Sequence, residues 1–234
     1  VAPAAPAASE VLSEVPETLA VMPLRGAVAF PGTMMPLVIG RPSSRRMLDE
    51  TLPESKQIAL VTQRDSGDED PDAAGLYEVG IAATVLKFVR QQDGAMQILV
   101  HGGPRIRLQR MLQRRPYFRA AVEPIAETPG GGRDFDAAVK QLREQARRLL
   151  ELSPQAPEQA VTVLINIEEP GHLADFLAAN LQLEMAERQD LLEETDVAKR
   201  VRAVLRHVSD QLEIANLQQK IQQDVQSSID ESQR

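Results

Sequence analysis

Few side chains in the sequence could catalyse a reaction or bind a metal, and their spacing matches no known motif. His101, His172 and His207 are far apart and form no H-E-x-x-H or other metal-binding pattern. The sequence contains no cysteine, which excludes thiolate catalysis, disulfides and cysteine zinc sites. Neither a G-x-x-x-x-G-K-[ST] phosphate loop nor a G-x-S-x-G nucleophile turn occurs. We therefore expect no catalytic residue, metal or cofactor in this chain.

The most basic segment, RIRLQRMLQRRPYFR, could bind phosphate groups. It contains arginines with no acidic residue among them: Arg105, Arg107, Arg110, Arg114, Arg115 and Arg119. In a strand, Arg105 and Arg107 would face solvent while Ile106 faces the core, which is the ordinary alternation of a half-exposed sheet. The same arginines, with Tyr117 and Phe118 nearby, could instead line a nucleic-acid groove. The formal net charge of −8 and an aromatic content of 3% disfavour nucleic acid as the main partner.

Residues 21–40, VMPLRGAVAFPGTMMPLVIG, are apolar apart from Arg25. The three prolines in this stretch would break a transmembrane helix, and the acidic residues that precede it do not fit a secretory signal. We therefore expect two short strands, 19–24 and 35–39, in a soluble protein that does not bind a membrane. Pro36 favours an edge position for the second strand, because proline cannot donate a hydrogen bond to a neighbouring strand.

Met34 and Met35 lie beside this predicted edge and have two possible roles. Methionine commonly fills irregular space in a core. Alternatively, the two side chains form a soft apolar surface of the kind that adapts to varied partners. An edge strand at this place could also add a bound peptide by backbone pairing.

The remaining pattern predicts a small barrel or rolled antiparallel sheet followed by helices. Pro42 is expected in the first turn of a helix that continues through SSRRMLDETL. Short apolar runs separated by QDG, GGP and RRP predict further strands at 58–63, 79–89, 96–102, 105–112 and 117–125.

The segment TPGGG at 128–132 is the predicted boundary between the strands and the helices. Asp134 is expected to cap the first helix after it. The chain is thus predicted to contain a disordered Ala/Pro tail at 1–17, a β-rich lobe at 18–128, a helical bundle at 129–194 and a long helix at 195–234.

The final helix has two apolar stripes. The first is Val197, Val201, Leu205, Val208, Leu212 and Ala215, and beyond Ile214 the pattern shifts to Leu217, Ile221, Val225 and Ile229. The second stripe is too thin to hold a lone helix, so we expect it to pack against a partner. The sequence ends in this helix without a terminating Gly or Pro, and we expect the natural polypeptide to continue.

The sequence resembles the N-terminal domain of Lon proteases over residues 18–234. The segment LAVMPLRGAVAFPGTMMPLVIGRPSSRRML is similar to the start of that domain, with its PLR strand and the G-R before the first helix. The L-Y-x-V-G after an acidic loop, the late G-x-x-R, HLADFLAANL and AERQDLLEETDVAKRV follow in the family's order.

This resemblance implies an α+β fold with a PUA-like pseudo-barrel, a helical bundle and a long helix. It implies recognition of unfolded or degron-bearing proteins for a hexameric ATP-dependent serine protease of the bacterial cytoplasm, with the mitochondrial matrix as the less favoured location. The ATP and Mg²⁺ site and the Ser/Lys dyad of the family belong to other segments, so no catalytic residue is assigned here.

Within this resemblance, we expect an apolar patch to capture substrate and the second stripe of the final helix to contact neighbouring subunits. The patch consists of Met22, Pro31, Met34, Met35, Pro36 and Leu37. The alternative is a free-standing PUA-like module that binds nucleic acid or a regulatory partner through the Arg105–Arg119 strand.

Overall fold

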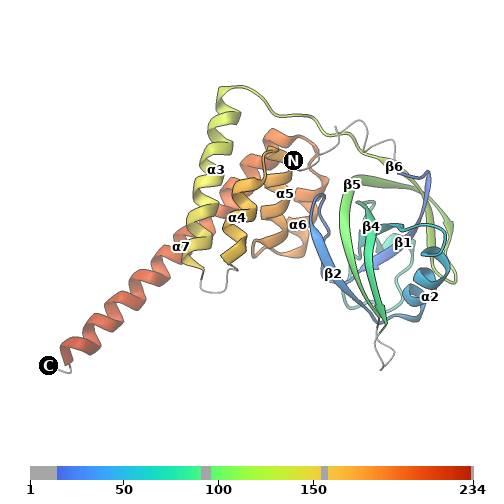
Figure 1. Ribbon diagram of the computed structural model, residues 1–234, viewed down its shortest axis with the longest axis horizontal. Helices are drawn as coiled ribbons and strands as arrows, with labels where there is room; N and C mark the ends of the chain where they lie inside the picture. The colour runs from blue at the N-terminus through green and yellow to red at the C-terminus, as the bar shows by residue number, and fades with distance from the viewer. Residues whose placement is uncertain (1–14, 91–95, 154–157, 233–234) are drawn as a thin grey trace. The chain divides into compact units, whose positions relative to one another are not determined.

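A computed structural model describes residues 15–90, 96–153 and 158–232. The chain forms two compact units (Figure 1). The first, here called the β unit, contains the residues up to Glu127 together with Gln182–Thr195. The second, the helical unit, contains Thr128–Leu181 and the residues from Asp196 onward. Within the described residues, no helix combines the length and apolar character needed to cross a membrane.

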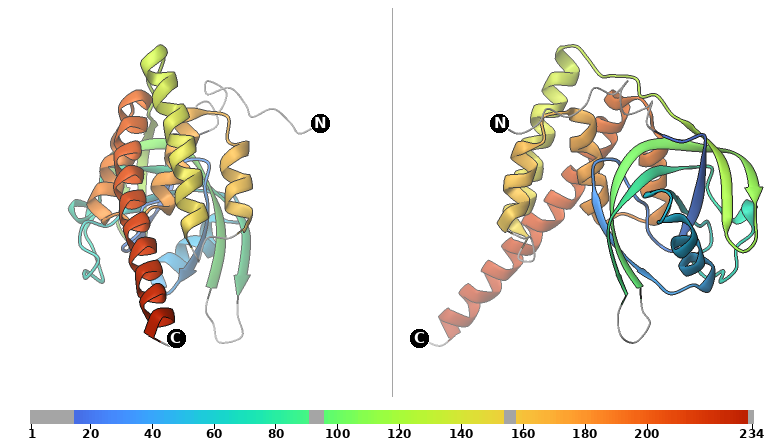
Figure 2. Two further views of the ribbon diagram at one scale, coloured as in Figure 1. Left: turned by 90° about the vertical axis from the view of Figure 1, so that its left-hand side faces the viewer. Right: turned by 45° about the vertical axis from the view of Figure 1, so that its right-hand side comes forward.

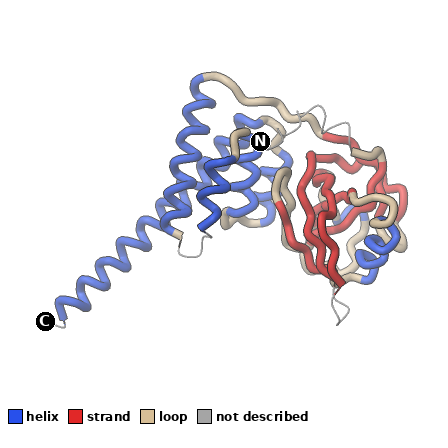
Figure 3. The backbone as a smooth tube through the Cα atoms, viewed as in Figure 1, coloured by secondary structure: helices blue, strands red, loops and turns tan. Residues whose placement is uncertain are grey.

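The β unit is built on one rolled sheet that closes on itself (Figure 3). Its strands follow the order β2-β5-β4-β3-β1-β6, and β6 also pairs with β5. Five strands therefore form a ring, and β2 extends the sheet outside it. The strands are β1 (Thr18–Leu24), β2 (Met34–Ile39), β3 (Gln57–Thr62), β4 (Val79–Arg90), β5 (Met96–Gln113) and β6 (Phe118–Pro124). The predicted rolled sheet is confirmed, although β1 and β3 are parallel.

The turn predicted at GGP is wrong, because β5 runs without interruption from Met96 to Gln113. A Cβ atom on Gly102 would lie 2.1 Å from the carbonyl oxygen of Phe30. A Cβ atom on Gly103 would lie 2.7 Å from the carbonyl oxygen of Ala82. These glycines therefore mark close backbone packing inside a strand rather than a turn. The unbroken strand pairs with β2 through its first half and with β6 through its second.

Aliphatic side chains fill the core of the β unit, as the low aromatic content requires. Leu19, Val21, Ala59, Val61 and Ile106 belong to one buried cluster within it. Helix α2 (Pro42–Thr51) begins at the predicted proline and lies against β1. Met47 and Leu48 of α2 are fully buried. A one-turn 3₁₀ helix, η1 (Ala73–Gly75), precedes β4.

Four helices form the helical unit: α3 (Arg133–Leu152), α4 (Glu158–Asn166), α5 (Pro170–Asn180) and α7 (Val197–Ser232). Helix α7 packs on α3 and α5 and then continues past them (Figure 2). Asp196 caps α7 by accepting a hydrogen bond from the Lys199 N–H at 3.0 Å, close to the predicted start. The predicted cap at Asp134 is wrong, because Gly132 occupies the cap position of α3 with a φ of 92°.

The first half of α7 is buried along one face within the helical unit. Val201, Val204 and Val208 are fully buried, whereas Leu205, a member of the first stripe, is half-buried. A buried ion pair, Arg200 Nε to Asp175 Oδ1 at 3.2 Å, joins α7 to α5.

Helix α6 (Met185–Glu193) belongs to the β unit, which differs from the predicted helical bundle at 129–194. The Gln189 side chain donates a 3.0 Å hydrogen bond to the carbonyl oxygen of Val79 on β4. The predicted tail is also shorter at its C-terminal end, since the Glu17 carbonyl accepts a hydrogen bond from the Val122 N–H. Residues 1–14 lie outside the described residues.

Arg105 on β5 is buried, with 2% of its surface exposed, and it connects three segments of the β unit. Its Nη1 lies 2.7 Å from Glu127 Oε1 in an ion pair, and its Nε donates a 2.7 Å hydrogen bond to the Leu192 carbonyl oxygen. The expectation that Arg105 faces solvent is wrong. The reason is that α6 and the segment leading to Glu127 cover this part of β5, which strand alternation alone cannot reveal.

Substituting Gly102→Ala should destabilise the β unit by about 2–3 kcal/mol, because a backbone carbonyl cannot move aside for the new methyl group. The matched control is Gly40→Ala, where an added Cβ atom would have no neighbour within 4 Å and the free energy of unfolding should change by less than about 1 kcal/mol. Both tyrosines of the chain, Tyr77 and Tyr117, lie in the β unit, so urea unfolding followed by tyrosine fluorescence measures the effect. Equal free energies of unfolding for the two variants would contradict the close approach of the Phe30 carbonyl to Gly102.

Substituting Arg105→Met should lower the free energy of unfolding of the β unit by about 2–3 kcal/mol. The substitution removes the guanidinium group that donates to the Leu192 carbonyl and to the partly exposed Glu127 carboxylate. Arg107→Met removes only an exposed contact of 3.7 Å to Glu78 and should cost less than about 0.5 kcal/mol. Urea unfolding followed by tyrosine fluorescence compares the two variants. If Arg105→Met lowers the free energy of unfolding no more than Arg107→Met does, Arg105 does not hold Glu127 and Leu192 to β5.

Candidate functional site

Two residues of the predicted substrate patch are inaccessible. Met22 is 2% exposed on β1, which lies between β3 and β6 and has buried side chains from Leu19 through Met22. Pro31 is buried in the connection between β1 and β2, directly after the buried Phe30. The expectation that Met22 and Pro31 contact substrate is therefore wrong. Met22 lies on a strand inside the sheet, and the connection that contains Pro31 packs into the β unit.

Strand β2 brings the other four patch residues to the surface in an alternating pattern. Met34 and Val38 have 57% and 71% of their surface exposed, and Pro36 between them is exposed. Met35 and Leu37 are half-buried on the opposite face. Val38 has the most exposed of these side chains, and the predicted patch did not include it.

The exposed side of β2 continues across β5 and β4. In the register of the sheet, Pro36 lies opposite Leu99 and Val38 lies opposite Gln97. Cross-strand partners point to the same face of a sheet. We use the name outer face for the apolar side chains that share this side of the three strands: Met34, Pro36, Val38, Leu99 and Val89.

A shallow groove between α2 and β4 adds apolar surface that the sequence did not predict. It has a volume of about 450 Å³ and is lined by Leu48, Leu52, Val85, Leu86 and Phe88, with charged residues beside them. The register of β4 shifts between Val85 and Lys87, and Leu86 and Phe88 in this segment are exposed. The charged residues within the run LKFVR are the sequence signal that could have indicated an exposed strand end.

The outer edge of β2 has no strand beside it in the described part of the β unit. There β2 pairs with β5 alone, which confirms the edge position predicted from Pro36. Next to the strand, the Gly102 N–H donates to the Thr33 carbonyl at 2.8 Å, so Thr33 directs its carbonyl toward β5. Because bonded and non-bonded positions alternate in an antiparallel pair, Met34, Pro36 and Val38 direct their backbone groups away from β5. Proline at position 36 thus removes no hydrogen bond from the sheet.

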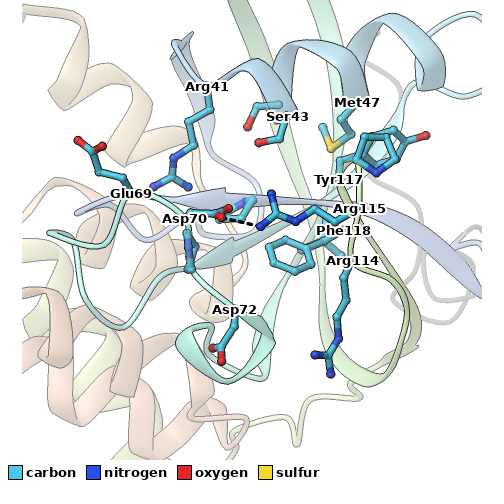
Figure 4. A pocket seen from close by; sticks show the side chains of 15 residues that line it. Arg41, Ser43, Met47, Glu69, Asp70, Asp72, Arg114, Arg115, Tyr117 and Phe118 are labelled. Atoms are coloured by element: carbon cyan, nitrogen blue, oxygen red, sulfur yellow. Dashed lines mark hydrogen bonds and ion pairs between the residues drawn. The ribbon is translucent and has the colours of Figure 1, made fainter.

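A second hollow, of about 220 Å³, lies beside the turn between β5 and β6 (Figure 4). Its walls carry Arg41, Arg114 and Arg115 together with Glu69, Asp70 and Asp72. Arg115 Nη2 lies 2.6 Å from Asp70 Oδ2, and Arg41 donates a 2.8 Å hydrogen bond to Gln63 Oε1. Burial, and then the nearby positive charge of Arg25, lower the pKa of Arg41. The opposite charges balance, so this hollow mainly joins the acidic loop to the β5–β6 turn.

The predicted basic strand does not form one continuous cationic face. Arg105 is buried, which contradicts its proposed contact with nucleic acid. Arg107 Nη1 lies 3.7 Å from Glu78 Oε2, and Arg115 forms an ion pair with Asp70. Arg110 and Arg114 are exposed. Acidic side chains therefore interrupt the surface that a phosphate backbone would need.

The second apolar stripe of α7 is exposed within the helical unit. Ile214, Leu217, Ile221 and Val225 each have more than half of their surface exposed. The side chain of Ile229 lies outside the described residues. Among the residues that the structure describes, no group of three or more His, Asp or Glu side chains could hold a metal ion.

Comparison with known proteins identifies one family. Residues 18–210 match the family described as the ATP-dependent protease La (LON) substrate-binding domain. The chain is 34% identical over 221 residues to the Lon protease of Dictyoglomus thermophilum, covering 94% of this chain and 28% of that protein. It is 35% identical over 219 residues to Lon protease 2 of Thermus thermophilus, covering 94% of this chain and 27% of that protein. The chain thus spans little more than a quarter of these relatives.

Two solved structures share the fold. The N-terminal domain of the Mycobacterium avium complex Lon protease matches with a TM-score of 0.68 at 19% identity, over 82% of this chain and 98% of that one. A Lon N-terminal domain protein from Xanthomonas campestris matches with a TM-score of 0.57 at 17% identity, over 81% of this chain and 97% of that one. The sequence match over residues 18–210, together with these relatives, shows that the chain belongs to the family of Lon protease substrate-binding domains.

Proposed function

We propose that the chain binds unfolded or degron-bearing polypeptides through the outer face and presents them to an ATP-dependent serine protease of the Lon type. In this proposal, other segments of the protease bind ATP and Mg²⁺ and cleave the substrate in the bacterial cytoplasm. The observation that carries the proposal is the pair of exposed apolar side chains, Met34 and Val38, on an uncharged edge strand. The family's description as a substrate-binding domain supports it.

The chemistry of the outer face suits a partner without a fixed shape. Methionine adapts to varied apolar groups, and Val38 and Leu99 add apolar area beside the single charge of Lys87. A surface of this size binds an unfolded chain only weakly. Several copies in a hexamer would raise the effective concentration of sites and so the overall affinity.

Nucleic acid is the less supported partner. Binding to phosphates requires clustered and accessible cations. Here Arg105 is buried, and Asp70 and Glu78 lie close to two of the other arginines.

We further propose that the exposed stripe of α7 packs against the same stripe of another copy of the chain. Leu217, Ile221 and Val225 recur every four residues, as in helices that pack along one face. The residues around them are mostly uncharged glutamines, so two copies can approach without strong repulsion. Single exposed helices are marginal in water, which favours such packing.

The double substitution Met34→Ser/Val38→Ser should weaken binding of an unfolded polypeptide about tenfold, because it removes the two most exposed apolar groups of β2. The probe is fluorescein-labelled, reduced and carboxymethylated α-lactalbumin, and fluorescence anisotropy measures the dissociation constant. The matched control is Leu112→Ser, which changes an exposed leucine in the second half of β5, away from β2. This variant should bind as the natural chain does. Binding by this mode should also change little with salt.

An unchanged affinity of the double variant, or an equal loss in Leu112→Ser, would contradict the assignment of the outer face. A steep fall in affinity with salt would instead favour the arginines.

The double substitution Leu217→Ser/Ile221→Ser should weaken self-association of the chain at least tenfold, because it makes the centre of the second stripe polar. Sedimentation velocity over a range of concentrations measures this. Ile165→Ser, an exposed isoleucine on α4, is the control and should associate like the natural chain. If the natural chain is monomeric throughout, or both variants behave alike, the stripe is not a contact between copies.

A further inference from the structure

We propose that the captured polypeptide binds as an added strand along the open edge of β2, so that backbone hydrogen bonds hold it and the outer face only supplements them. This inference rests on the proposed function and specifies its binding mode. The bound segment is an extended stretch of unfolded chain whose alternate side chains are apolar.

The first argument is the direction of the backbone groups. The N–H and C=O groups of Met34 and Val38 and the C=O group of Pro36 point away from β5, as the hydrogen bond between Gly102 and Thr33 fixes. An extended chain placed beside β2 can therefore exchange two hydrogen bonds with each of Met34 and Val38. It can also donate one to the carbonyl of Pro36.

The second argument is that this edge lacks most of the usual protection. Edge strands are normally guarded against pairing by charged side chains, proline, bulges or a covering segment. Of these devices, the sequence of β2 has only Pro36, which removes one donor and leaves the groups of Met34 and Val38 available. The sequence of β2, MMPLVI, contains no charge, and the side chains of Met34 and Val38 are exposed. Within the described part of the β unit, β2 is placed at an end of the sheet while the other five strands close into a ring.

Pro36 indicates that the occupant is a foreign chain rather than a second β2. Two copies of β2 related by a two-fold axis can form hydrogen bonds only as antiparallel strands, with the outward residues Met34, Pro36 and Val38 of one copy opposite those of the other. Any such alignment that forms more than one residue pair places Pro36 of both copies within the ladder. Both copies then lack a donor. A foreign strand without proline opposite Pro36 meets only one missing donor. Its hydrogen-bond ladder with β2 is therefore more complete than the ladder between two copies of β2.

Binding through the backbone also explains why such a site can accept many sequences. Every non-proline residue offers the same N–H and C=O groups, so main-chain pairing provides affinity without a sequence requirement. Guest residues opposite Met34, Pro36 and Val38 would point to the outer face, which favours apolar side chains at every second position. Folded proteins rarely present an extended segment with unpaired backbone groups, whereas unfolded ones do.

The test compares Val38→Pro with Val38→Ala in the whole chain. Val38→Pro removes an outward N–H but no hydrogen bond to β5, and Pro36 shows that the strand accepts proline at an equivalent position. Val38→Ala keeps the N–H but removes more apolar surface than proline does. Strand addition predicts that Val38→Pro weakens binding of the labelled, unfolded α-lactalbumin at least fivefold more than Val38→Ala does. A contact made only by side chains predicts the opposite order.

Two further measurements keep the inference testable if Val38→Pro does not fold. Amide hydrogen exchange of the natural chain, followed by NMR, should show that a saturating probe protects Met34 and Val38. Docking onto the outer face alone would leave these amides exchanging as before. Pro36→Val restores the missing donor and should bind the probe more tightly.

The outcomes separate the two proposals. If the natural chain binds the probe but its Met34 and Val38 amides are not protected, strand addition is wrong and the proposed function stands. If Val38→Ala weakens binding as much as Val38→Pro does, the same conclusion follows. If the natural chain does not bind the unfolded probe at all, both proposals fail.

Discussion

The contact between the backbones of Gly102 and Phe30 is the constraint on which the β unit depends. It permits β5 to pass without a break under the connection that joins β1 to β2. Because β5 is continuous, its first half can pair with β2 while its second half closes the ring with β6. A side chain at position 102 would push these segments apart, and the exposed strand would lose the register that positions its apolar residues.

Closure of the ring also decides where a further strand could pair with the sheet. A closed sheet satisfies its own backbone groups, which removes most opportunities for pairing with another chain. The strand that stays outside the ring, β2, keeps an edge that no described strand of the β unit pairs with, next to exposed methionine and valine side chains. Apolar contact and backbone pairing are therefore offered at the same place. The proposed binding of many unfolded sequences would gain from both, since neither interaction requires a particular side chain in the partner.

Arg105 illustrates a different use of a charged residue in the same strand. Its guanidinium group lies in the interior, where the Leu192 carbonyl and the Glu127 carboxylate replace its lost hydration. These contacts attach a segment near residue 190 to a strand almost ninety positions earlier in the sequence. The same sheet thus uses arginines for internal support, while Arg115 and Asp70 stabilise a surface loop.

Local sequence patterns were sufficient to predict most elements and the edge position of β2. Proline at position 36 and the apolar alternation around it are properties of the chain itself, because they follow from a missing donor and from the two-residue period of a strand. The exposure of the second stripe of α7 likewise follows from spacing, since no further apolar residues were available to widen it. The tertiary structure alone decided that Met22, Pro31 and Arg105 are buried, that GGP lies inside a strand and that α6 packs on β4. Each of these depends on which distant backbone comes within a few ångströms, and a local pattern carries no information about such approaches.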